Sequence, residues 1–216
     1  MRYFSFKKAG CIIYVSAFVF LQSCINGYTA WEKDTIKNGI KFSKLRYALK
    51  DQDTIAVIGY LSEPAVIEDF PCAADWVHFT KDWKLSLFRL DQPAVINNFD
   101  YGKDCWIRFK ETGHTVICSF PEDTEVQGLM CRGGGGVSGI QTTFYKSGRL
   151  ESFYPTDVIL IGDVLCKGSI FHNIVLHEDG TLKTCTLARD QKINDKMYEK
   201  GTRIVIDKNG SASIVE

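Results

Sequence analysis

Six cysteines between residues 72 and 185 are the side chains best suited to chemistry in this chain. A thiol can act as a nucleophile, bind a metal or form a disulfide. A zinc site needs closely spaced ligands, but no Cys-x-x-Cys occurs, and the four histidines are scattered, at His78, His114, His172 and His177. A catalytic cysteine or serine needs a base held nearby, and the sequence indicates no such pairing. We therefore expect no metal site, no cofactor and no catalytic residue.

A run of four glycines, Gly133 to Gly136, has the composition of a phosphate-binding loop. Such a loop continues through Gly-Lys-Ser/Thr into a helix. Here Val137-Ser138-Gly139-Ile140 follows and leads into a strand-like stretch. The run therefore predicts a flexible lengthening of a connecting segment.

The charge balance argues against nucleic acid as a partner. The chain has 26 basic and 26 acidic residues. Three of the basic residues (Arg2, Lys7 and Lys8) lie in the first 23 residues, which hold no acidic ones, so the remainder has 23 basic against 26 acidic residues. Proteins that bind nucleic acid present a basic stripe or patch, which this pattern lacks.

The first 23 residues have the pattern of a signal peptide. After the positive start, Ala9 to Leu21 is an apolar run broken only by Gly10 and Ser16. As a helix this run would be about 20 Å long, whereas the hydrocarbon layer of a membrane is about 30 Å thick. The run is too short to span a membrane and has the length of a signal-peptide core.

Leu21-Gln22-Ser23-Cys24 follows this run and resembles the bacterial lipobox, although Gln22 departs from the small residue usual at that place. The resemblance implies that residues 1–23 are a signal peptide, that Cys24 carries the lipid, and that residues 24–33 are a lipidated tether. It places the protein in the bacterial cell envelope, anchored in a membrane through its lipid. Ile25 is not the aspartate that retains some lipoproteins at the inner membrane, which favours the outer membrane. The alternative is an uncleaved short anchor or a core helix with an incidental cysteine.

Residues 34–216 show internal repetition, which is the first property to establish in a chain of this kind. Leu61-Ser-Glu-Pro-Ala-Val-Ile67 and Leu90-Asp-Gln-Pro-Ala-Val-Ile96 are near copies, and equivalent points recur every 29 to 34 residues. Between these connecting segments lie stretches rich in β-branched and aromatic residues, interrupted by polar turns. The expected turns are Lys50–Asp53, Lys81–Trp83, Glu111–Gly113, Lys146–Gly148, Glu178–Gly180 and Lys208–Gly210.

This pattern predicts an all-β protein of about six tandem β-hairpin units. A single hairpin cannot bury both of its faces, so neighbouring units must pack or pair. We expect an elongated, twisted antiparallel sheet, in a solenoid-like or open-barrel form. No stretch has a sustained helical period with caps, so we expect little helix.

The cysteines fall into two sets within the repeat. Cys72, Cys105, Cys131 and Cys166 are assigned to one repeat position, near the outgoing strand, and Cys118 and Cys185 to a second, on the return strand. Equivalent positions lie two strands apart, about 9.6 Å, beyond the roughly 7 Å that a disulfide spans. We therefore predict disulfides within units, Cys105–Cys118 and Cys166–Cys185. The alternative is six reduced thiols in the core.

Phe144-Tyr145-x-x-Gly148-x-Leu150 resembles the core of a MORN-type repeat, in the variant found in antitoxin-like hairpin proteins. The likeness covers about ten residues of a unit and implies scaffolding or binding rather than catalysis. We expect a protein or glycan partner, with Trp76, Trp83, Trp106 and Tyr145 as candidate contacts. The alternatives are an envelope enzyme or thiol-redox factor that uses the cysteines, and an antitoxin-like or immunity protein.

Overall fold

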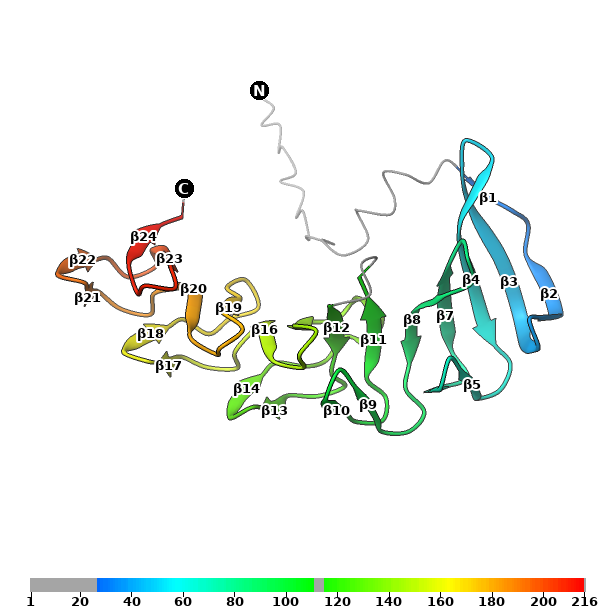
Figure 1. The fold of residues 1–216 in the computed structure, drawn as a ribbon, viewed down its shortest axis with the longest axis horizontal. Helices are drawn as coiled ribbons and strands as arrows, with labels where there is room; N and C mark the ends of the chain where they lie inside the picture. The colour runs from blue at the N-terminus through cyan, green and yellow to red at the C-terminus, as the bar shows by residue number, and fades with distance from the viewer. Residues whose placement is uncertain (1–26, 111–114, 216) are drawn as a thin grey trace, which may run out of the picture.

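The computed structural model describes residues 27–110 and 115–215, and these form one long antiparallel sheet with a series of small hairpins along it (Figure 1). The expected signal peptide and Cys24 lie outside the described residues. Within the described residues the one helical element is the short 3-10 turn η1 (Gly136–Ser138). The all-β prediction is therefore confirmed.

The main sheet contains 14 strands, and apart from β2 they follow chain order in space. Most of the sheet consists of six consecutive hairpins, each paired with the next. Every strand therefore lies beside a strand of its own unit or of an adjacent unit. The sheet does not close on itself. Its strands are β1 (Gly27–Tyr28), β2 (Glu32–Lys37), β3 (Ile40–Lys50), β4 (Asp53–Leu61), β7 (Trp76–Thr80), β8 (Leu85–Arg89), β11 (Trp106–Phe109), β12 (Val116–Ser119), β15 (Thr142–Phe144), β16 (Leu150–Phe153), β19 (Ile174–Leu176), β20 (Leu182–Thr186), β23 (Arg203–Ile206) and β24 (Ala212–Ile214).

Each connecting segment of the repeat is itself a two-stranded ribbon, which the sequence analysis did not predict. Both central turn residues of the first two ribbons have positive φ: Glu68 (49°) and Asp69 (68°), then Asn97 (50°) and Asn98 (58°). A two-residue turn with positive φ at both positions matches the right-handed twist of the strands that it joins. The ribbons are β5 (Ala65–Ile67) with β6 (Phe70–Cys72), β9 (Ala94–Ile96) with β10 (Phe99–Tyr101), β13 (Thr124–Val126) with β14 (Leu129–Cys131), β17 (Ile159–Ile161) with β18 (Val164–Cys166), and β21 (Gln191–Ile193) with β22 (Lys196–Tyr198).

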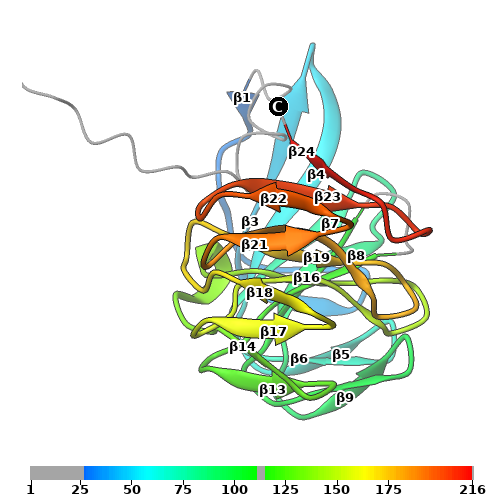
Figure 2. The same ribbon diagram turned by 90° about the vertical axis from the view of Figure 1, so that its left-hand side faces the viewer.

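The ribbons follow one another along one side of the main sheet, from β5 and β6 to β21 and β22 (Figure 1 and Figure 2). The core lies between them and the inner face of the main sheet, and it runs continuously through all units. In every ribbon, the residue that ends the second strand is buried in the core. These equivalent residues are Cys72, Tyr101, Cys131, Cys166 and Tyr198.

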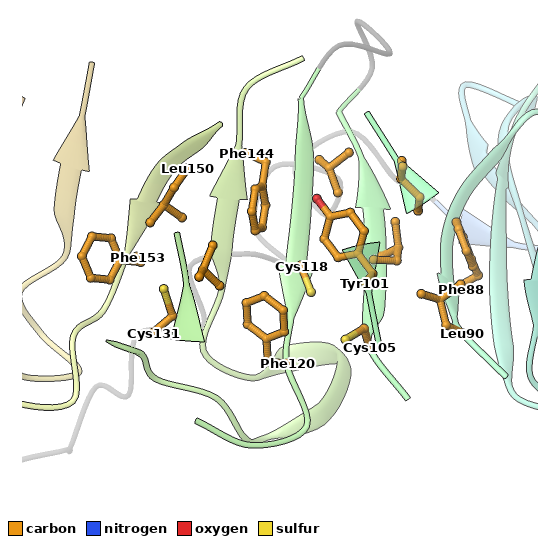
Figure 3. Close-up of a cluster of buried hydrophobic side chains, with 14 of the residues drawn as sticks. Phe88, Leu90, Tyr101, Cys105, Cys118, Phe120, Cys131, Phe144, Leu150 and Phe153 are labelled. Atoms are coloured by element: carbon orange, nitrogen blue, oxygen red, sulfur yellow. The ribbon is translucent and has the colours of Figure 1, made fainter. Parts of the chain in front are cut away.

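Aromatic rings fill the middle of this core (Figure 3). Phe144 is fully buried, and its ring centre lies 4.6 Å from that of Phe99, 5.3 Å from Tyr101 and 6.4 Å from Phe120. These rings come from the ribbon of β9 and β10, from the residue after β12 and from β15, so the contact joins neighbouring units. Burial of rings of this size supplies much of the stability of a fold without helices.

Five of the six expected turns lie where strands of the main sheet reverse, while residues 111–113 of the sixth fall outside the described residues. The start of the folded part differs from expectation. Residues 27 and 28 form β1 and pair with β3, and β2 begins at Glu32. The stretch just before residue 34, expected as part of the tether, therefore belongs to the sheet.

Candidate functional site

The structure brings together the cysteines that the sequence predicts as pairs. The thiols of Cys105 and Cys118 lie close enough to influence each other's pKa, and so do those of Cys166 and Cys185. All four are buried, at most 2% exposed, and all are free thiols in this structure. The disulfides therefore remain a prediction.

Both pairs have the same geometry. Cys166 forms a bridge with Leu187, two residues beyond Cys185, so the two thiols are diagonal neighbours on one face. Continuing the register of Trp106 and Ser119 by one residue gives Cys105 the same relation to Cys118. Diagonal Cα atoms lie about 7–8 Å apart, at the limit of disulfide reach, so oxidation requires a small local approach of the strands.

The assignment of Cys105 to the column of Cys72, Cys131 and Cys166 was wrong. Tyr101 occupies that position in its unit, because it ends β10 as Cys72 ends β6. Cys105 instead lies in the loop before β11, where its carbonyl accepts a hydrogen bond from Leu90. The sequence pattern predicts each connecting segment as a single stretch and not as a two-stranded ribbon, so the register predicted for Cys105 was wrong.

Burial controls the acidity of these thiols. It raises the pKa of Cys72 and of Cys131 to about 12 each. In the pairs, the interaction with the partner thiol lowers the pKa of Cys105 and of Cys185, while burial raises the pKa of Cys118. Reactive cysteines combine a lowered pKa with access to solvent, and the buried pairs lack this access.

The histidines that the structure describes do not form a cluster, and two of them contact other residues. His177 Nε2 lies 2.9 Å from the carbonyl oxygen of Ile206, and His172 Nδ1 lies 3.4 Å from the hydroxyl of Thr186. His114 is outside the described residues. Among the residues that the structure does describe, no group of three or more His, Cys, Asp or Glu is placed to hold a metal ion.

The glycine run forms a tight turn that leads into η1. Gly134, Gly135 and Gly136 all have positive φ, a conformation that favours glycine. Gly133 passes so close to the carbonyl of Glu122 that any Cβ there would collide with it. These glycines are therefore explained by local backbone geometry.

Of the four aromatic contacts predicted from sequence, Trp83 and Trp106 are packed inside the protein, and half-buried Tyr145 is hydrogen-bonded to the next hairpin. Trp83 packs against Phe42 and Phe79, with ring centres 6.4 and 5.3 Å away. Trp106 is buried, with 9% of its surface exposed, and is not accessible to a partner in this structure. The hydroxyl of Tyr145 donates a 2.8 Å hydrogen bond to the carbonyl of Leu176 in the next hairpin, which joins the two units.

Trp76 is different, because it lies on the outer face of the main sheet beside other rings. The cross-strand register sets Lys44, Tyr60 and Trp76 side by side on β3, β4 and β7. The ring of Trp76 lies 5.3 Å from Tyr60 and 5.8 Å from Trp31. The Lys44 ammonium lies over three of these rings, 4.4 Å from the centre of Trp76. All four side chains are half-buried, so their outer surfaces face solvent.

A second row runs beside the first on the same face. Arg46 pairs with Ile58, Ile58 with His78, His78 with Leu87, and Leu87 with Arg108. We call the two rows together the basic-aromatic face; it comprises Trp31, Lys44, Arg46, Tyr60, Trp76, His78 and Arg108.

The electrostatics of this face are unusual because its cations lack acidic partners. Lys44, Arg46 and Arg108 form no ion pair with the described residues. Burial lowers the pKa of Arg108, and burial together with the charges of Arg108 and Arg46 lowers the pKa of His78 to about 4. His78 is therefore neutral at physiological pH. The neighbouring Arg89, by contrast, is neutralised by Asp75 and Asp104.

Arg46 is held rigidly at the edge of this face. Its guanidinium lies 3.9 Å from the ring centre of Tyr28 and 4.3 Å from that of Trp31. Its Nε atom is buried and has no hydrogen-bond partner in the described part of the chain. A buried donor without an acceptor is costly and uncommon in native proteins.

Trp76 was predicted from the sequence as a contact, but its neighbours on this face were not. The available signal was the alternation Lys44-x-Arg46, Trp76-x-His78 and Trp106-x-Arg108, in which polar or aromatic residues alternate with buried ones. Period-two alternation puts such residues on one face of a sheet. Their meeting on adjacent strands depends on the register, which sequence alone does not supply.

The fold and the face together define a tandem hairpin-repeat protein with an open antiparallel sheet. Comparison with protein-family models, curated proteins and solved structures finds no match to this chain. Across residues 27–110 and 115–215, no helix is long and apolar enough to cross a membrane.

Proposed function

We propose that this chain is a lipid-anchored protein of the bacterial cell envelope whose hairpin-repeat domain binds another macromolecule and performs no catalysis. The observation that supports binding most directly is the basic-aromatic face, where Lys44 lies over three partly exposed rings. Tryptophan, tyrosine and arginine are the residues that most often carry binding energy at protein surfaces. The proposal is based on the grouping of such residues on the outer face of the main sheet.

The membrane attachment in this proposal depends on Cys24. Each buried methylene of an acyl chain contributes roughly 0.8 kcal/mol of membrane affinity, so two or three chains hold a protein firmly. The proposed location is the outer membrane, with the repeat domain either in the periplasm or at the cell surface. Metabolic labelling with a palmitate analogue tests the anchor: the wild type takes up label and Cys24→Ala does not. An unlabelled wild type or a labelled Cys24→Ala variant would refute it.

The redox alternative receives less support from the geometry. A thiol-redox factor must bring a thiolate to its substrate, but the paired cysteines are at most 2% exposed. The antitoxin-like or immunity alternative gains no specific contact from the described residues. Neither is therefore carried further as a second proposed function.

Binding is tested by affinity purification of the full-length protein from detergent-solubilised envelopes. The test variant is Trp76→Ala, and the control is Phe171→Ala, which removes an 80% exposed ring that is not part of the basic-aromatic face. The expected result is a protein or glycan retained by the wild type and by Phe171→Ala but lost from Trp76→Ala. Equal retention by all three forms would refute the assignment of the face.

A further inference from the structure

We infer that the basic-aromatic face binds an acidic polysaccharide; this rests on the proposed binding function and specifies its ligand class. The first argument is charge. Three cations, Lys44, Arg46 and Arg108, lie on this face without any carboxylate partner among the described residues, although Arg89 beside them has two. An anionic ligand would supply the negative charge that these three cations do not find within the described residues. Hydrogen bonds between charged partners are stronger than neutral ones, so an anion gains most here.

The second argument is spacing. Arg46, His78 and Arg108 occupy one cross-strand row on β3, β7 and β11, and successive members are two strands apart. Strands lie about 4.8 Å apart, so the members repeat at about 9.6 Å. This interval is comparable to the length of two linked pyranose rings. The two arginines at the ends of the row thus suit a polymer that carries carboxylates at regular intervals.

The third argument is the row of rings beside the cations. The ring of Trp76 contacts those of Tyr60 and Trp31 at 5.3 and 5.8 Å, and all three rings are half-buried, so part of each stays exposed beside Lys44. The face of an aromatic ring is electron-rich and packs against weakly positive C–H groups, which line the faces of pyranose rings. Cations and rings in adjacent rows therefore match the charged groups and the ring faces of one sugar chain.

An acidic peptide fits this surface less well. The basic-aromatic face is the flat side of a sheet, whose backbone donors and acceptors are used in the ladders between β3, β4, β7, β8 and β11. An extended peptide binds a sheet most readily at an open edge, where it adds main-chain hydrogen bonds. A sugar polymer needs none of these bonds.

The experiment compares two polymers of the same backbone: polygalacturonate, which carries a carboxylate on each sugar, and its fully methyl-esterified form, which carries none. Binding to the full-length protein in detergent micelles is measured by calorimetry at low and at physiological salt. Polygalacturonate is expected to bind at least about tenfold more tightly than the ester, and less tightly as salt increases.

Two variants connect the binding to the face. Arg46→Gln removes the charge and is expected to weaken polygalacturonate binding by about tenfold. Lys192→Gln is the matched control: its side chain is 60% exposed on a ribbon and pairs with Asp195, so binding should not change. If Arg46→Gln loses its folded circular dichroism spectrum, Lys44→Gln replaces it.

The outcomes separate this inference from the proposed function. Equal binding of the acid and ester forms would overturn the acidic ligand class while leaving macromolecular binding intact. If neither polymer binds but a protein from the envelope is captured in a Trp76-dependent way, the acidic ligand class is likewise overturned and macromolecular binding stands. If neither polymer binds and no Trp76-dependent partner is captured, the inference and the proposed function both fail.

Discussion

The turn glycines Gly148 and Gly180 form a matched pair that tests how the ribbons pack on the sheet hairpins. They occupy the same place in successive hairpins, with φ of 81° and 90°, and their amides donate equivalent hydrogen bonds to Tyr145 and His177. A Cβ on Gly180 would have no atom within 4 Å. A Cβ on Gly148 would collide with the carbonyl oxygen of Asn97, in the turn of a ribbon.

The space around each glycine determines how much an alanine there should lower the free energy of unfolding. Alanine in a left-handed conformation costs about 1–2 kcal/mol, and both substitutions pay this cost. The collision at Gly148 involves backbone on both sides, so the chain must move, and overpacking of this kind typically costs about 1–3 kcal/mol more. Gly180→Ala should therefore lower the free energy of unfolding by about 1–2 kcal/mol, and Gly148→Ala by about 2–5 kcal/mol.

Urea unfolding followed by tryptophan fluorescence and circular dichroism measures the difference. The midpoint of Gly148→Ala should lie clearly below that of Gly180→Ala, while the dependence on urea concentration stays the same. If the two variants unfold at the same midpoint, the ribbon turn does not rest on the hairpin turn, and the two-layer packing described here is wrong.

Three further predictions concern the core, the buried histidine and the thiols. Phe144→Ala removes a ring packed among Phe99, Tyr101 and Phe120 and should cost about 3–5 kcal/mol in urea unfolding, whereas a loss below about 1 kcal/mol would contradict the packing. Because the pKa of His78 falls from 6.5 to about 4 on folding, stability should be full above pH 6.5 and decline as the pH falls towards 4, by about 3 kcal/mol at most. His78→Gln should flatten this decline in melts across that range, and an unchanged profile would assign it to other groups. The two predicted disulfides should each add about 3 kcal/mol if they form without strain, and mass spectrometry of the exported, unreduced protein will show four fewer free thiols; six free thiols would end the proposal.

The fold class followed from the sequence because hairpin turns leave a local signature. Polar turns such as Glu178–Gly180, set between β-branched stretches, specify a reversal without reference to the rest of the chain. The same signature was present in the connecting segments. In the near copies that begin at Leu61 and Leu90, the two residues after Ala-Val-Ile are turn residues, followed by phenylalanine in a second strand. Strands of three residues are too short to show period-two alternation clearly, so the ribbons were taken for simple connections.

The candidate site was less accessible to sequence reasoning. Trp76 could be found because tryptophan is rare and large, but whether a ring packs inward or faces solvent depends on strand register. A bulge in β3 between Phe42 and Lys44 brings Lys44 opposite Tyr60. One residue of slip would have exchanged the inner and outer faces. The sequence placed each predicted cysteine pair within one unit, which the structure brings together, although the repeat position assigned to Cys105 was wrong.

The order of strands has a consequence for how the chain is made. Each strand of the sheet lies beside one from the same or the adjoining unit, so no early segment waits for a distant one to arrive. A chain synthesised from its amino end can thus fold its units in the order of synthesis. Each new hairpin then pairs with the edge of a hairpin that has already folded. Folding of this chain during synthesis would therefore resemble the growth of a polymer crystal, in which each new segment adds to an ordered end.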